Sequence, residues 1–303
     1  MRFKLLKPSD YADYKPFFRN QPYNLCIYTL PSLIVWTNSM ARHHSRVIDD
    51  MLVMYIDYPK GHFYPHMLMP ISPEKPVFPE TLKELAGIAG LDKYSNVPEE
   101  FITTHGREAV EALFHIEEQP EFEDYVYHTK DLAWLKGKKY AKKRNLINQF
   151  KKEFILENRV RTEPMTKDIA EECLVFLEEW CEEKDCGEDR DKILACEREA
   201  AINAITHLED IGMNGLVLRI DGKINAFGIA SWLNDKMGVL HFEKAFNNVK
   251  GLYQYFDRGC ARQLFGDFTY INKESDMSIP GIAHAKNSYF PMMRIKSFKL
   301  TLK

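Results

Sequence analysis

The sequence lacks the features that mark membrane and secreted proteins. No stretch of 18 or more residues is continuously apolar, and the longest candidate, Leu25 to Trp36, is interrupted by Pro31. A membrane-spanning helix is therefore not expected. The N-terminal segment, residues 1–8, is too short and too charged for a signal peptide. Six cysteines without paired spacing predict reduced thiols in a cytoplasmic protein.

The chain also lacks an excess of charge of one sign. Its net charge of −3 argues against a protein devoted to coating nucleic acid. The histidines and cysteines show no spacing typical of a metal site, so no metal is expected. A hydrophobic fraction of 45% and a charged fraction of 28% describe an ordinary globular protein.

The length of 303 residues predicts two domains of about 150 residues each, because one hydrophobic core rarely serves a longer chain. The extended polar segment 158–164 marks a shift in composition. We therefore predict a first domain of residues 1–155, ending in a basic helix, and a second domain of residues 156–303. The acidic segment 178–191 is predicted to be a loop between two helices.

A basic segment is present before this boundary. Between Lys136 and Lys152 there are eight Lys or Arg residues and no acidic residue, set among apolar ones. Such a helix can bury its apolar side and hold a positive face toward the phosphates of an anionic ligand. The alternative is a solvated surface helix. Asn145 and Asn148 could also tie this helix to the other domain.

The second half opens with three apolar runs joined by short turns. The runs are Leu216 to Ile220, Ile224 to Leu233 and Met237 to Phe246, separated by Asp221-Gly222 and Asn234-Asp235. This pattern is typical of an antiparallel meander. Apolar residues at helical spacing follow from Leu252 to Leu264, and the predicted order ends with a strand at 267–272, a helix at 283–289 and a strand at 292–300.

The junction between the third strand and this helix is a candidate anion site. The loop ends in Lys250-Gly251 and leads directly into the helix. A helix start presents free backbone N–H groups and the positive end of the helix dipole at one spot. That spot suits an anion.

Several sequence blocks in this region resemble one known family. The blocks at 242–245, 250–253, 270–276 and 285–291 resemble the C-terminal half of the family related to the phosphatidylglycerol lysyltransferase C-terminal domain, and those at 124–127 and 143–150 resemble its central motif. The blocks occur in the family's order and together cover roughly residues 120 to 291. This likeness implies an α+β (α/β) fold of two tandem GNAT-like (acyl-CoA N-acyltransferase) domains. Each would be a mixed, mainly antiparallel sheet flanked by helices, similar to the Fem-type peptidoglycan aminoacyltransferases.

The resemblance also implies a reaction. An acyl- or aminoacyltransferase of this superfamily moves an acyl group from acyl-CoA, or from aminoacyl-tRNA, to an amine or hydroxyl acceptor. Coenzyme A or acyl-CoA is thus the expected cofactor, and a small molecule or aminoacyl-tRNA the expected donor. The chemistry needs an anion-binding helix start, an N–H aimed at the oxyanion and a group that removes the nucleophile's proton.

These requirements assign roles to particular residues. Glu243 is the candidate base, Tyr289 the candidate acid, and Lys244 a neighbour of the base or an anion contact. The predicted donor-binding loop is Asn248, Val249, Lys250, Gly251, Leu252 and Tyr253. The predicted substrate-binding residues are Asn272, Glu274, Asp276 and Lys286 on the acceptor side, and Lys143, Arg144 and Asn148 in the basic segment. The alternative is a buried salt-bridge network, for example Glu243 with Lys286, that holds strand to helix.

Two departures from the family pattern favour a second function class. The family usually has Gly where this chain has Ser278, and Arg where it has Ala283. An Arg replaced by Ala loses a bidentate anion contact. The alternative function is therefore a non-catalytic nucleotide- or anion-binding module that retains the GNAT fold.

Overall fold

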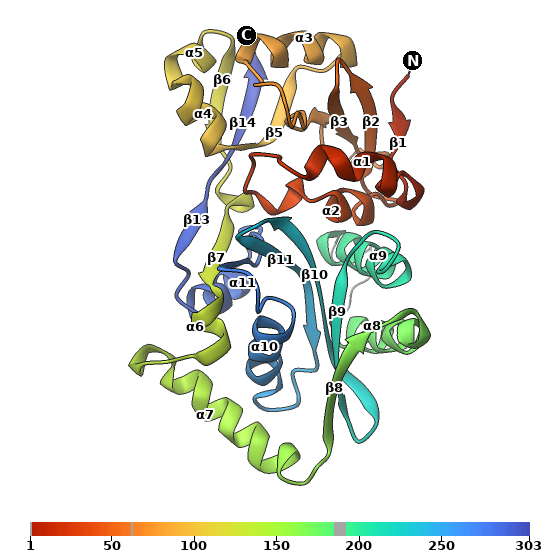
Figure 1. The fold of residues 1–303 in the computed structure, drawn as a ribbon, viewed down its shortest axis with the longest axis vertical. Helices are drawn as coiled ribbons and strands as arrows, with labels where there is room; N and C mark the ends of the chain where they lie inside the picture. The colour runs from red at the N-terminus through yellow and green to blue at the C-terminus, as the bar shows by residue number, and fades with distance from the viewer. Residues whose placement is uncertain (1, 62, 185–191) are drawn as a thin grey trace. The chain divides into compact units, whose positions relative to one another are not determined.

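The computed structural model describes residues 2–61, 63–184 and 192–303. The chain forms two compact units (Figure 1). The first comprises Met1–Tyr125, Glu274–His284 and Met293–Lys303, and the second comprises Val126–Lys273 and Ala285–Met292. Residues 155 and 156 both lie within the second unit. The domain boundary predicted between them stays a prediction.

The first unit contains a seven-stranded mixed sheet in the order β1-β2-β3-β4-β5-β14-β6. Its described elements are β1 (Lys4–Leu5), α1 (Tyr11–Phe18), α2 (Leu30–Val35), β2 (Arg42–Ile48), β3 (Met51–Asp57), β4 (His66–Met67), α3 (Pro79–Ala89), β5 (Lys93–Pro98), α4 (Glu99–His105), α5 (Arg107–Glu111), β6 (Phe114–Glu118) and β14 (Ser297–Leu302). The last strand of the chain, β14, thus completes this sheet by pairing with β5 and β6.

The second sheet has the order β13-β7-β12-β11-β10-β9-β8. The described elements here are β7 (Asp124–His128), α6 (Thr129–Trp134), α7 (Ala141–Phe150), β8 (Val160–Met165), α8 (Ala170–Lys184), α9 (Lys192–His207), β9 (Asn214–Ile220), β10 (Lys223–Asn234), β11 (Met237–Ala245), α10 (Leu252–Gln263), β12 (Tyr270–Asn272), α11 (Pro280–Asn287) and β13 (Met293–Ile295). The predicted meander is confirmed as the antiparallel strands β9, β10 and β11.

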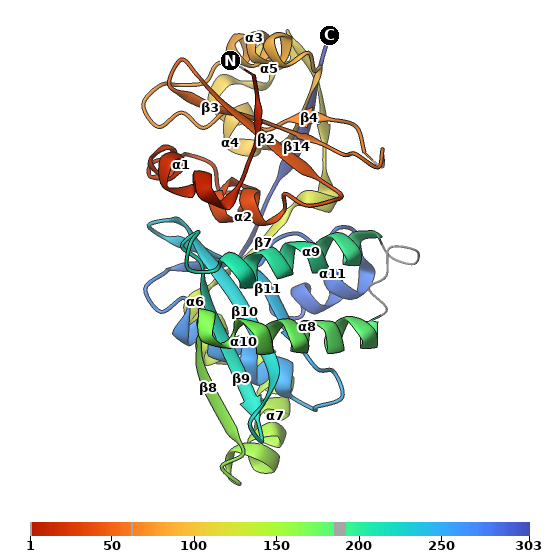
Figure 2. The same ribbon diagram turned by 90° about the vertical axis from the view of Figure 1, so that its right-hand side faces the viewer.

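Helices cover both faces of the meander. Phe227 of β10 packs edge-on against Phe176 of α8, with ring centroids 5.6 Å apart. The neighbouring Gly228 faces the other way, since a Cβ added there would lie 2.8 Å from the sulfur of Cys260 on α10. Figure 2 shows α8 and α9 in front of the strands on the first of these faces. Consecutive residues of a strand point to opposite faces, which explains this division.

The sheet opens beside β11. The parallel strands β11 and β12 pair only from Met237↔Tyr270 to Val239↔Asn272, and α10 connects them. Beyond Val239, β11 continues to Ala245 while β12 ends. The pairing with β10 also shifts register between Ile229↔Phe242 and Ala230↔Leu240, so that His241 is a bulge. The second half of β11 is therefore not paired with β12, and the sheet is open along this edge.

Some expected elements differ from the structure. The predicted loop at 178–191 is wrong for residues 178–184, which belong to α8, and the rest of that segment lies outside the described residues. The predicted strand at 292–300 is two strands, β13 and β14, in different sheets. Within the described ranges, no helix has the length and apolar content needed to cross a bilayer.

Candidate active site in the second unit

The register of β11 separates two residues that are adjacent in the sequence. Glu243 lies opposite Gly228, so its side chain points to the α10 face, into the opening of the sheet. Lys244 lies opposite Phe227 and points to the α8 face. There its Nζ donates a hydrogen bond to Glu197 Oε1 at 2.6 Å. The structure therefore does not bring Lys244 to the side of the sheet where Glu243 lies.

Glu243 belongs to a buried cluster of charges. Lys273, the residue after β12, donates from Nζ to Glu243 Oε2 at 2.9 Å and to Asp257 Oδ1 at 2.7 Å. Asp257 comes from α10 and is only 4% exposed. One ammonium group therefore bridges two carboxylates from different elements across the opening of the sheet.

The environment of Glu243 suits proton transfer near neutral pH. Its Oε1 atom is buried and has no hydrogen-bond partner among the described residues. Burial, followed by the negative charge of Asp257, raises the pKa of Glu243 to about 7, although Lys273 and Lys286 lower it. A carboxyl group with this pKa and a free oxygen can accept or release a proton.

Lys273 keeps its charge in this cluster. Burial by itself lowers its pKa, but the carboxylates of Asp257 and Glu243 outweigh burial and raise the pKa well above its usual value. The ammonium is therefore a permanent positive charge beside Glu243.

Tyr289 lies in the same cluster. It follows α11, and its ring has the Nζ atoms of Lys143 and Lys273 at 3.9 and 5.6 Å from its centroid. Burial and the negative charge of Asp257 raise the pKa of Tyr289 well above its usual value. The phenol thus remains protonated and can donate its proton or a hydrogen bond. The structure brings Tyr289 and Glu243 together through Lys273 and Asp257.

Two further lysines line this cluster. Lys286 donates from Nζ to the backbone oxygen of Lys273 at 2.5 Å. Lys143 is half-buried and donates to Ser288 Oγ at 2.7 Å, and it forms no ion pair with any described carboxylate. Burial, together with the charge of Lys273, lowers the pKa of Lys143, while Asp257 raises it.

The loop before α10 is anchored by packing. Asn248 and Lys250 are exposed, whereas Val249, Leu252 and Tyr253 join an apolar cluster that includes Phe150 and Phe256. Gly251 has φ of +82°, and a Cβ added there would lie 2.2 Å from the backbone oxygen of Leu146 in α7. The backbone of α7 therefore occupies the space beside Gly251 that a side chain would fill.

The other predicted residues have structural contacts. Arg144 donates to the backbone oxygens of Leu135 and Gly137 at 2.5 and 2.7 Å, while Asn148 is exposed. Asn272 is fully buried at the end of β12. Glu274 and Asp276 belong to the first unit.

In the first unit, these two residues hold backbone and side chains in place. The backbone oxygen of Glu274 accepts a hydrogen bond from the Tyr125 amide at 3.1 Å. Asp276 accepts one from the Tyr125 hydroxyl at 2.5 Å and one from the Ser278 amide at 2.8 Å. Ser278 has φ of +56°, a conformation that favours Gly, which explains the glycine usual in the family.

Sequence reasoning missed Asp257 and the bridging role of Lys273. A signal for Asp257 was present, because it stands four residues after Tyr253 and three before Cys260 in an otherwise apolar stripe. An acidic residue at such a position must find a buried partner. No comparable pattern marks Lys273.

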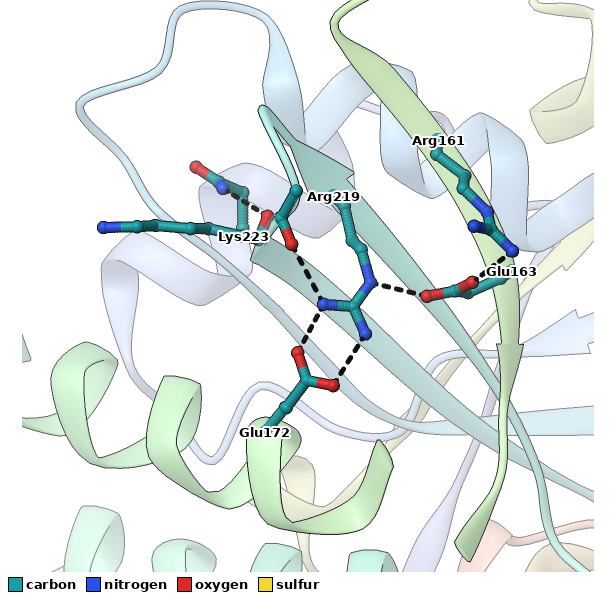
Figure 3. A network of polar contacts seen from close by, with 7 residues as sticks. Arg161, Glu163, Glu172, Arg219 and Lys223 are labelled. Carbon is teal, nitrogen blue, oxygen red and sulfur yellow. Dashed lines mark hydrogen bonds and ion pairs between the residues drawn. The ribbon is translucent and has the colours of Figure 1, made fainter. Parts of the chain in front are cut away.

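A second charged network lies on another part of this unit (Figure 3). Arg219 of β9 is bound by Glu163 of β8 and Glu172 of α8, and Arg161 pairs with Glu163 at 2.9 Å. The hydrogen bonds that Arg219 donates to Glu172 and Glu163 raise its pKa. The guanidinium is saturated by protein groups, so this network joins strands to a helix.

Comparison with known proteins agrees with this architecture. A conserved protein of unknown function from Bacteroides thetaiotaomicron is 28% identical, with both chains covered over 100% of their length and a TM-score of 0.88. The C-terminal domain of a putative lysylphosphatidylglycerol synthetase from Agrobacterium fabrum is 14% identical, with 85% of this chain and 84% of that chain covered and a TM-score of 0.60. No curated protein matches the chain.

The fold is the predicted α+β fold of two units, each a mixed sheet flanked by helices. The model of the family described as phosphatidylglycerol lysyltransferase, C-terminal, matches residues 29–300. The chain belongs to this family, which confirms the resemblance found in the sequence.

Proposed function

We propose that the second unit transfers an acyl or aminoacyl group from an activated donor, acyl-CoA or aminoacyl-tRNA, to an amine or hydroxyl acceptor. Membership of the family supports an acyl- or aminoacyltransferase-type function in general. The observation that carries the proposal is Glu243, a carboxyl group with a buried, unengaged oxygen and a pKa of about 7 at the opening of the sheet.

In this proposal Glu243 is the base. Its Oε1 takes the proton of the acceptor nitrogen or oxygen as that atom attacks the carbonyl carbon of the donor. The tetrahedral intermediate then breaks its bond to the sulfur or ribose oxygen of the donor. Tyr289 gives its phenolic proton to that leaving group, and the proton held by Glu243 returns through solvent to the phenolate. The net reaction exchanges one acyl bond for another and moves one proton.

The need for Tyr289 depends on the donor. A thiolate is a weak base, since thiols have a pKa of about 8.5, and it leaves without help. A ribose alkoxide is a far stronger base and must be protonated as it leaves. We therefore expect Tyr289→Phe to impair transfer from an aminoacyl ester much more than transfer from a thioester.

The remaining predicted residues take supporting roles in the proposal. Lys143 and Lys286 provide positive charge for an anionic group of the acceptor or donor, because Lys143 has no carboxylate partner among the described residues. Asn248 and Lys250 remain exposed for contact with a donor. Gly251 does not fit the role of a pyrophosphate contact, since α7 covers it.

The alternative function is a binding module without catalysis. Two observations favour a binding module. Glu243 is paired with Lys273, and the backbone of α7 fills the space beside Gly251 in the donor loop. Such a protein would bind the donor and leave it intact.

Turnover and binding assays separate the two functions. We would measure free thiol release from a panel of acyl-CoA thioesters, and deacylation of aminoacyl-tRNA, each with amine and hydroxyl acceptors. Wild-type turnover should fall by about 10²- to 10⁴-fold in Glu243→Gln and be unchanged in the exposed control Glu157→Gln. Binding of a donor without turnover would establish the module instead. Turnover equal in Glu243→Gln and wild type would refute the assigned base.

A further inference from the structure

One face of α10 carries positive charges that the proposed reaction does not use. Arg258 and Arg262 are one helical turn apart, on the same stripe as Gly251 and Tyr255. Lys151 follows directly after α7, the helix against which this stripe packs. The three cations come from two elements that are distant in the sequence.

Contacts along the stripe place the three cations together. Gly251 meets the end of α7 at Leu146 and Phe150, and the Tyr255 ring lies 4.8 Å from that of Phe150. Arg258 has its guanidinium 5.7 Å from the centroid of the Tyr255 ring. Lys151, the next residue after Phe150, is thereby brought close to Arg258 on the facing helix.

Arg262 continues the stripe toward α6. Its Nε donates to the backbone oxygen of Ala133 at 2.7 Å, and its guanidinium lies 4.6 Å from the centroid of the Trp134 ring. Trp134 is 56% exposed. A large aromatic ring that remains open to solvent beside an arginine provides a flat surface for stacking a nucleobase.

The part of the protein that the structure describes does not neutralise these cations. No described carboxylate forms an ion pair with Lys151, Arg258 or Arg262. Burial and the charges of the two arginines lower the pKa of Lys151, and burial and Arg262 lower the pKa of Arg258. Arg219 in Figure 3 is the opposite case, because two carboxylates surround it. Like charges gathered without an acid destabilise the free protein and are relieved by an external anion.

We propose that Lys151, Arg258 and Arg262 bind the phosphate groups of a nucleotide, with Trp134 available to stack its base. Guanidinium groups bind phosphate through paired hydrogen bonds, and Lys151 adds a point charge. This site rests on the proposed function only in one respect, which is that the phosphates would be those of the donor. The site also explains where donor phosphates can bind when α7 covers Gly251.

Calorimetric titration at low salt tests the site with four probes: pyrophosphate, adenosine 3′,5′-bisphosphate, a short single-stranded RNA and uncharged adenosine. The wild type should bind the phosphorylated probes and not adenosine, with affinity falling as salt rises. Arg258→Gln and Lys151→Gln should each weaken binding by about 10-fold or more. The exposed Lys236→Gln is the matched control and should bind as the wild type does.

The relative affinities identify the source of the phosphates. Tighter binding of the bisphosphate than of RNA indicates a coenzyme-like donor, and the reverse indicates a nucleic acid. Loss of affinity for the bisphosphate but not for pyrophosphate in Trp134→Ala supports base stacking. Arg258→Gln should melt at the same or a higher temperature than the wild type, because the substitution removes repulsion, so lost binding would not reflect unfolding.

Two results would overturn the proposal: no binding of any phosphorylated probe at millimolar concentration, or equal losses in Lys236→Gln and Arg258→Gln. Glu243→Gln separates this inference from the proposed reaction. It should bind the probes normally even if the protein proves to have no transferase activity.

Discussion

At the scale of the residue, the behaviour of Glu243 follows from the groups that surround it. A carboxylate buried beside a second carboxylate is disfavoured, and the single ammonium of Lys273 offsets only part of that cost. The family resemblance identified Glu243 from the sequence. The sequence marks Asp257 as a buried acid, but it does not show that Asp257 and Lys273 meet Glu243, because they come from a helix and a strand end that approach it only in the folded unit.

We predict a pH-dependent contribution of Glu243 to stability. Its folded pKa of about 7 exceeds the value of 4.5 expected when unfolded, so the folded state holds more protons between these two pH values. The free energy of unfolding should therefore fall as pH rises through this window, by on the order of 1–3 kcal/mol. Urea unfolding at pH 5, 6, 7 and 8 measures this fall.

Glu243→Gln provides the reference for this experiment. Because Gln does not titrate, the difference in unfolding free energy between wild type and variant should shrink or reverse as pH rises. Parallel pH profiles for the two proteins would show that Glu243 has an ordinary pKa in the folded state.

At the scale of the element, the contact of α7 with the start of α10 decides how the donor loop can be used. The sequence predicts a helix after Gly251 and an anion site at the start of that helix. It does not reveal what approaches, because the α7 backbone comes from a segment about a hundred residues earlier in the chain. The same glycine would serve a phosphate or a helix equally well.

We predict that Gly251→Ala destabilises the second unit by about 2–4 kcal/mol, the sum of a left-handed backbone and a collision with Leu146. Gly222→Ala is the matched control, since Gly222 has φ of +84° and nothing within 4 Å of an added Cβ. It should cost only about 1 kcal/mol. Denaturant unfolding of both variants measures the difference. Equal losses of unfolding free energy in the two variants would mean that the α7 backbone does not exclude a side chain at position 251.

At the scale of the whole molecule, the two sheets do not follow the order of the chain. The strand β7, which precedes the second half, pairs with β12, and β14 at the C-terminal end lies between β5 and β6. The change in composition predicted a boundary near residue 155 because polar linkers differ in composition from folded segments. A strand that joins a sheet far from its own place in the chain does not change the composition, since it carries an ordinary alternating pattern.

We predict that removing residues 297–303 unfolds the first unit, because β14 supplies the hydrogen-bonded partner of two strands and the buried side chains Phe298 and Leu300. Limited proteolysis should then cut within residues 1–125 much faster than in the full chain. Removal of Lys303 alone is the control and should leave the pattern nearly unchanged. A shortened chain that resists protease as well as the full one would contradict the role of β14.

The sequence by itself determined the local features of this protein: the three-stranded meander, the helix after Gly251 and the family to which the chain belongs. These depend on residue periodicity, on turn residues and on motifs, all of which are read within a few neighbouring positions.

The tertiary structure alone decided which side chains meet. Glu243 and Lys244 are separated to opposite faces by the pleat and register of β11, while Lys273 and Asp257 converge on Glu243 from other elements. The physical reason is that charge pairing and pKa depend on distances of a few ångströms between groups that are far apart in the chain. Those distances exist only after the elements have packed.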